Sequence, residues 1–114
     1  MKLNLFWEDT DKNTYKLGKL YKVNSFFNFD INEDELKKAI KHGCFGIGEF
    51  TFLKNHYEST ELFDFFNNRI PKKTDPFIDN ILSNLNLKEY NEIELLKLTE
   101  GKLPIDRYFL REDL

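Results

Sequence analysis

The chain has 114 residues, of which 40% are hydrophobic and 32% charged, which fits one folded domain and excludes a disordered segment. The formal net charge of -3 argues against a general binder of nucleic-acid backbones. The single cysteine, Cys44, excludes an internal disulfide and a thiolate zinc site.

The first 30 residues predict a three-stranded antiparallel meander. Residues 2–8 alternate between apolar and polar side chains, with Leu3, Leu5 and Trp7 on one face. A polar turn over residues 9–13 leads to a second strand over residues 15–23, and a third strand follows over residues 26–29. Gly18 breaks the alternation of the second strand, which indicates a bulge or a close approach between two backbones.

A helix is predicted to begin at Asn32, because Asn32 and Glu35 have the spacing of a capping box. Gly43 suits its C-terminal cap. Three apolar side chains form its expected buried stripe: Leu36, Ala39 and Ile40. Residues 49–53 are expected to form a short strand.

Residues 62–71, with the sequence LFDFFNNRIP, are the most distinctive segment. They predict a short aromatic helix with Ser59 as its N-cap and Pro71 as its end. A helix with this many rings needs a surface to pack against. The polar turn that follows it places amide and guanidinium groups beside that packed patch.

Two more short helices and a strand complete the chain. Thr74 or Asp75 is expected to cap the first helix, with Pro76 in its first turn. Asn91 and Glu94 repeat the capping spacing for the second helix. The expected apolar stripes are Ile78, Ile81, Leu82 and Leu85 in one helix and Ile93, Leu95, Leu96 and Leu98 in the other. A last strand over residues 106–111 makes residues 1–114 one α+β domain.

The residues that could support catalysis or bind a metal favour structural interpretations. His42 and Cys44 lie two positions apart, whereas a catalytic pair is normally brought together by the fold, so a buried thiol after a helix is favoured. Asp9, Asp11 and Asn13 start like a calcium loop but lack its glycine and its closing Glu, which favours a solvated hairpin turn. No catalytic residue, metal or cofactor is therefore predicted.

A targeting or membrane segment is also not predicted. The N-terminus turns acidic too early for a signal peptide, and no apolar run approaches the ~18 residues of a membrane span. A cytoplasmic protein is expected.

Several short motifs carry a resemblance to a known family. They are Tyr57-Glu58-Ser59, Leu62-Phe63, Phe65-Phe66, Asn68-Arg69-Ile70-Pro71, Ile81-Leu82, Leu95-Leu96 and GKLPID at residues 101–106. Together they resemble the small N-terminal domain of HipA-type serine/threonine kinases of bacterial toxin–antitoxin systems. In that family a segment of the type LxxFFxNLxP precedes two short helices and a Leu-Leu…Gly element. Residues 15–20, YKLGKL, are similar to the family's xxGxL strand.

The sequence ends where the kinase core of that family begins. The resemblance therefore implies a stand-alone HipS-like protein of a three-gene, HipBST-type system. Such a protein would be a non-enzymatic antitoxin-like subunit that binds and inhibits a HipT-like kinase, with a helix-turn-helix DNA-binding antitoxin in the same complex. Residues 103–106 depart from HipA and are closer to uncharacterised proteins that carry HIRAN domains.

The residues expected to contact such a kinase lie in and after the aromatic helix: Phe63, Phe66, Asn67, Asn68, Arg69, Lys72 and Lys73. The amide and charged side chains are expected to be exposed, and the rings to be mostly packed. One alternative is a nucleic-acid-associated module that uses Lys16, Lys19 and Lys22 with Tyr15 and Tyr21. Another alternative is a phage-encoded inhibitor of a host defence protein.

Overall fold

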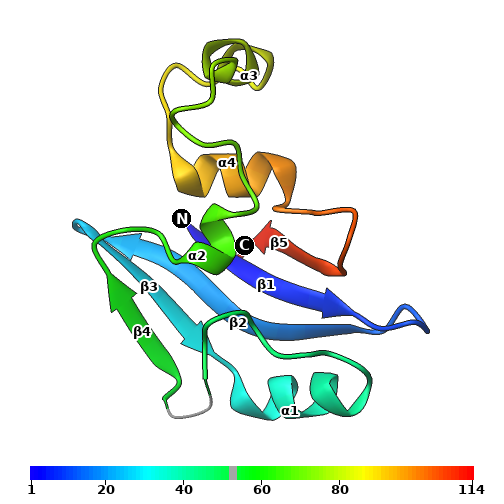
Figure 1. Cartoon of the computed structure of the whole chain (residues 1–114). Helices are drawn as coiled ribbons and strands as arrows, with labels where there is room; N and C mark the ends of the chain where they lie inside the picture. Colours follow the sequence, from blue (N-terminus) through cyan, green and yellow to red (C-terminus); the bar gives the residue numbers. More distant parts are fainter. Residues whose placement is uncertain (52–53) are drawn as a thin grey trace.

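Five antiparallel strands form a single sheet in the order β4-β3-β2-β1-β5 (Figure 1). The computed structural model of the chain describes residues 1–51 and 54–114. The strands are β1 (Lys2–Glu8), β2 (Thr14–Val23), β3 (Phe26–Ile31), β4 (His56–Ser59) and β5 (Tyr108–Glu112). The predicted meander and C-terminal strand are both confirmed. The strand predicted over residues 49–53 lies partly outside the described residues, and Phe50 forms an isolated bridge with Ile47.

Gly18 creates the bulge that the sequence predicts. Leu5 lies opposite Gly18 and Phe6 opposite Lys16, so Leu17 is an extra residue in β2. A Cβ atom on Gly18 would lie 2.4 Å from the carbonyl oxygen of Asp30, which leaves no room for a side chain. The close approach of β2 to β3 therefore requires glycine at this position.

The helices and the loops around them cover one face of the sheet. The helices are α1 (Glu33–Lys41), α2 (Asp64–Asn67), α3 (Ile78–Asn84) and α4 (Glu92–Thr99). Figure 1 shows α2 and α4 over the sheet and α3 farther from it, beyond α4. The largest fully buried side chains lie between these layers: Phe29, Phe66, Leu3, Leu5, Leu17, Leu20, Ile47, Leu95, Leu96 and Leu110.

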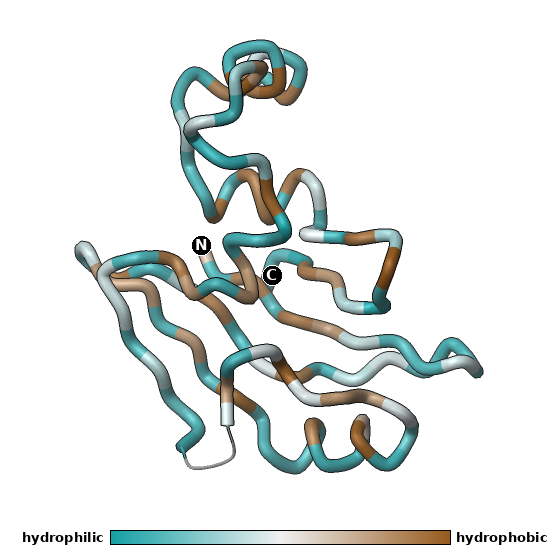
Figure 2. Tube along the Cα trace, viewed as in Figure 1, coloured by the Kyte–Doolittle hydropathy of each residue, from teal (hydrophilic) through white to brown (hydrophobic). Residues whose placement is uncertain are grey.

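The opposite face of the sheet, which we call the polar face, carries paired charges. Lys19 forms an ion pair of 2.8 Å with Asp113, and His56 lies 2.5 Å from the carboxylate of Asp30. Phe6 stacks on Phe109, with ring centroids 5.2 Å apart. The hairpin tip between β1 and β2 is hydrophilic as well (Figure 2).

The helix caps confirm two predictions and correct a third. Asn32 accepts a hydrogen bond from Glu35 N, and Asn91 accepts one from Glu94 N, so both capping spacings are used. Ser59 does not cap the aromatic helix, because Ser59 ends β4 and α2 begins at Asp64. The carboxylate of Glu49 instead accepts from Phe65 N at 3.2 Å, a long-range cap that local sequence does not reveal.

The start of α3 and the exposure of two apolar side chains also differ from expectation. The helix predicted from Thr74 or Asp75 begins only at Ile78, and Asp75 instead accepts a hydrogen bond from Phe77 N in the preceding turn. Ile40 and Leu98 were expected in buried stripes but are exposed. Ile40 directly follows buried Ala39 in α1, and Leu98 lies two residues after buried Leu96 in α4.

Candidate functional site

The aromatic segment around α2 is mainly core. Phe66 is 0% exposed, and its ring lies 5.0 Å from that of Phe29 in β3 and 5.2 Å from that of Phe65. The prediction that Phe66 contacts a partner is therefore wrong, because the ring is fully enclosed between the sheet and α2. Phe63 is half-buried, with its ring 5.2 Å from that of Phe50, and keeps an outer edge at the surface.

Arg69 is not an exposed contact, which corrects a second expectation. Its side chain is 3% exposed, and its guanidinium donates to Asp106 at 2.5 Å and to the carbonyl of Gly101 at 2.8 Å. The guanidinium also lies 4.5 Å from the centre of the Phe65 ring and 5.0 Å from that of Tyr108. A buried charge is tolerated only when it is paired in this way, so Arg69 is a structural clamp.

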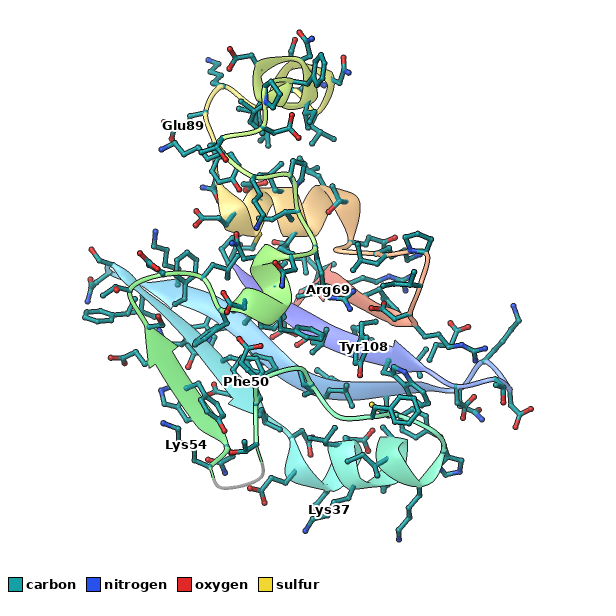
Figure 3. All side chains as sticks on the ribbon, viewed as in Figure 1. Lys37, Phe50, Lys54, Arg69, Glu89 and Tyr108 are labelled. Carbon is teal, nitrogen blue, oxygen red and sulfur yellow. The ribbon has the colours of Figure 1, made fainter. Side chains whose placement is uncertain are left out.

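Tyr108 extends the clamp to the loop after α1 (Figure 3). Its hydroxyl donates to the carbonyl of Gly46 and lies 3.5 Å from the thiol of Cys44. Burial first, and then the hydrogen bond to Cys44, raise the pKa of the Tyr108 hydroxyl well above its usual range. This hydroxyl therefore stays protonated and serves as a fixed donor.

Three of the predicted contact residues come together beside α2. Asn67, Lys72 and Lys73 line a hollow of about 300 Å³, whose other lining residues are Tyr90 and Glu92. The Tyr90 hydroxyl donates to the carbonyl of Pro71 at 2.7 Å and fixes the turn that carries the lysines. Asn68 is exposed. We call Asn67, Asn68, Lys72 and Lys73 the turn surface.

The residues of the nucleic-acid alternative lie on two faces of the sheet. Lys16, Lys19 and Tyr21 lie on the polar face, where Lys19 pairs with Asp113 and Tyr21 donates to Asp30 at 2.9 Å. Tyr15 is buried on the other face, with its ring 5.8 Å from that of Trp7. Lys22 extends over the ring of Phe27, which belongs to the core. The five residues therefore form no common stacking platform.

His42 and Cys44 each make contacts with other residues. His42 Nδ1 lies 2.8 Å from the carbonyl of Lys38, and the ring lies 5.6 Å from that of Tyr15. Cys44 is buried and directs its thiol to Gly46 and Tyr108. These contacts favour a structural role for both residues.

Asp9 is the buried exception in the predicted solvated hairpin turn, because this residue is only 3% exposed while residues 10–13 are exposed. It accepts hydrogen bonds from the backbone of Asp11 and Asn13 and from the Tyr15 hydroxyl, each at 2.9 Å. Across residues 1–51 and 54–114, no three His, Cys, Asp or Glu side chains are grouped so that they could hold a metal ion.

A surface that sequence reasoning missed lies at the other end of the clamp. Phe45 and Ile105 are both exposed and line one hollow together with Trp7 and Tyr108. Periodicity gives no information about residues in loops. The one usable signal is an aromatic residue in a glycine-rich loop, since Phe45 lies between Gly43 and Gly46.

Comparison of the chain with protein-family models, with curated proteins and with solved structures finds no match in any of the three. In the part of the chain that the structure describes, no helix is long and apolar enough to cross a membrane.

Proposed function

We propose that the chain is a non-enzymatic, HipS-like antitoxin subunit that binds and inhibits a HipT-like serine/threonine kinase in the bacterial cytoplasm. The observation that carries the proposal is the turn surface, where Asn67, Lys72 and Lys73 surround one hollow at the end of the family-like segment. The element order supports it too, because a β-meander followed by short helices is what the resemblance implies.

The turn surface is suited to binding because its support is rigid. Ile70 is buried on one side of the turn, and the Tyr90 hydroxyl holds the carbonyl of Pro71 on the other. Arg69, the residue before Ile70, is held by its hydrogen bonds to Gly101 and Asp106. A pre-ordered surface loses little conformational entropy on association, so its contacts contribute more fully to affinity.

The chemistry of the turn surface fits an acidic partner patch. Lys72 and Lys73 supply two exposed ammonium groups, and Asn67 and Asn68 supply amide donors. No ion pair engages either lysine within the described residues. Both charges therefore remain available to steer the kinase and to hold it in one orientation, which would occlude or distort its active site.

A pull-down with the tagged chain from the source bacterium tests the proposal. The expected result is a serine/threonine kinase whose autophosphorylation falls when the purified chain is added. A double charge reversal, Lys72→Glu with Lys73→Glu, should weaken the complex by about tenfold or more. Recovery of no kinase, or of a kinase that the chain leaves fully active, would contradict the proposal.

The chain offers a matched control for the charge reversal. Lys37 and Lys41 are exposed on α1, and Lys37 points away from the sheet and from α2 (Figure 3). The double variant Lys37→Glu with Lys41→Glu changes the net charge by the same amount. It should leave kinase binding unchanged, which separates a local contact from a general effect of charge.

A further inference from the structure

An apolar hollow of about 250 Å³ opens between the loop after α1 and the loop before β5. Phe45 on one side is fully exposed, and Ile105 on the other is 87% exposed. Trp7 and Tyr108 also line this hollow, which we call the Phe45 notch. We propose that the Phe45 notch binds a short segment of a partner protein in which an apolar side chain neighbours a carboxylate.

The first wall of the notch is held outward by its loop. Gly43 and Gly46, on either side of Cys44 and Phe45, adopt positive φ angles of 108° and 96°, which favour glycine. Cys44 and Ile47, in the same loop, are buried. The ring of Phe45 is therefore presented to solvent by a fixed loop, and little order has to be gained when a partner covers it.

The second wall is anchored by the clamp. Asp106, which follows Ile105, is bound by Arg69 and also accepts from the backbone N–H of Tyr108 at 3.3 Å. Tyr108 in turn donates to Gly46, beside Phe45. One hydrogen-bonded cluster thus fixes both walls, so the width of the notch is set before any partner binds.

The charge at the rim selects the partner. Arg107 lines the notch, is exposed, and forms no ion pair within residues 1–51 and 54–114. The carboxylate of Asp106 is already neutralised by Arg69. Glu8, which lines the adjoining hollow with Arg107, forms no ion pair with it in the described structure. An uncompensated guanidinium beside an apolar hollow is complementary to a carboxylate beside an apolar side chain.

A protein segment fits this arrangement better than other occupants do. Among the described residues that line the notch, Arg107 is the one Lys or Arg side chain, whereas a nucleic-acid backbone needs a row of cations. Large exposed apolar side chains that flank a hollow are typical of protein–protein contacts, where one buried anchor contributes most of the affinity. The notch also lies apart from the lysines of the turn surface, with which its lining shares no residue.

Trp7 provides a direct reporter, because it is the only tryptophan in the chain and it lines the notch. A random linear peptide library is selected on the full chain. The enriched peptides are expected to share an apolar residue next to Asp or Glu, and to shift the emission of Trp7 when they are titrated in. Failure to enrich any peptide, or enriched peptides that leave the Trp7 emission unchanged, would overturn the proposal.

Variants then locate the contact. Phe45→Ala with Ile105→Ala should weaken peptide binding by about tenfold or more, and Arg107→Glu should do the same and remove its dependence on salt. Phe77→Ala is the matched control, since Phe77 is a large exposed ring on the distant α3 side of the molecule and should not affect binding. Equal effects of Phe45→Ala and Phe77→Ala would overturn the proposal.

Self-association is a distinct outcome. If the chain forms dimers that Phe45→Ala with Ile105→Ala abolishes, the occupant is a second copy and the proposed partner is wrong. The kinase experiment is independent of these results, because it depends on Lys72 and Lys73. Recovery of no kinase by the wild-type chain, with intact peptide binding, would contradict the proposed function alone.

Discussion

Asp9 shows how one buried carboxylate organises the β1–β2 hairpin. Burial by itself would raise the pKa of this carboxyl group. The hydrogen bonds that it accepts from Asn13, Tyr15 and Asp11 outweigh burial, and the pKa lies below the ordinary value of 3.8. The hydrogen bond between Asp9 and Tyr15 has the opposite effect on the tyrosine. Burial first, and then this hydrogen bond, raise the pKa of the Tyr15 hydroxyl.

Stability should therefore depend on the charge of Asp9. Because the folded pKa is lowered, the carboxylate stabilises the fold above its ordinary, unfolded pKa of 3.8, and this contribution is lost as the pH falls through the folded value. We expect Asp9→Asn to be less stable than the wild type at about pH 7, and the gap between them to narrow below about pH 4. Urea unfolding across this pH range measures the gap.

Asp11→Asn is the control for this pH series. Asp11 donates its backbone N–H to Asp9, and the substitution removes none of the hydrogen bonds that Asp9 accepts. The variant should stay within about 0.5 kcal/mol of the wild type at neutral pH. If the stability difference between Asp9→Asn and the wild type stays constant across the acid range, the charge of Asp9 does not contribute to stability.

At the scale of elements, Arg69 joins pieces of structure that are far apart in sequence. It follows α2, and its hydrogen bonds reach Gly101 and Asp106 in the segment between α4 and β5. Arg69→Ala leaves the Asp106 carboxylate unpaired and removes the group packed between Phe65 and Tyr108. We expect it to lower the free energy of unfolding by about 3 kcal/mol, measured by urea unfolding.

Two comparisons make this prediction specific. Asn68→Ala changes the exposed neighbour and should cost within about 0.5 kcal/mol. Arg69→Lys keeps the charge but cannot donate to both Asp106 and Gly101 in the same planar geometry. We therefore expect it to be only a little more stable than Arg69→Ala. An Arg69→Ala protein as stable as Asn68→Ala would refute the clamp.

The sequence predicted the elements better than it predicted the site. Alternation, capping spacings and Gly18 gave the meander, α1, α4 and the bulge, because these depend on residues a few positions apart. The burial of Arg69 depends on Asp106, and the cap of α2 depends on Glu49. Only the fold brings such partners together. The sequence around Arg69 is therefore as compatible with an exposed arginine as with a buried one.

The whole molecule is unevenly packed. Phe66 and Leu95 are fully enclosed beside the sheet, whereas the apolar side chains of α3 are mostly only half-buried. Figure 1 shows α3 as the element farthest from the sheet. A short helix of this kind contributes few buried contacts, so it is expected to open without unfolding the rest.

Hydrogen exchange should separate these two regions. The amides of Ile81 and Leu85 in and after α3 are expected to exchange faster, by about tenfold or more, than those of β1 and β2, because they need only local opening. Exchange measured by NMR at neutral pH gives both rates in one experiment. Equal protection of α3 and the central strands would mean that the molecule opens as one unit.

The burial of Cys44 makes the folded chain suited to site-specific labelling. Its thiol is enclosed by the loop after α1 and by Tyr108, and the sequence contains no second cysteine. A cysteine introduced at Lys16, on the exposed polar face, would therefore be the thiol that a maleimide dye reaches in the native state.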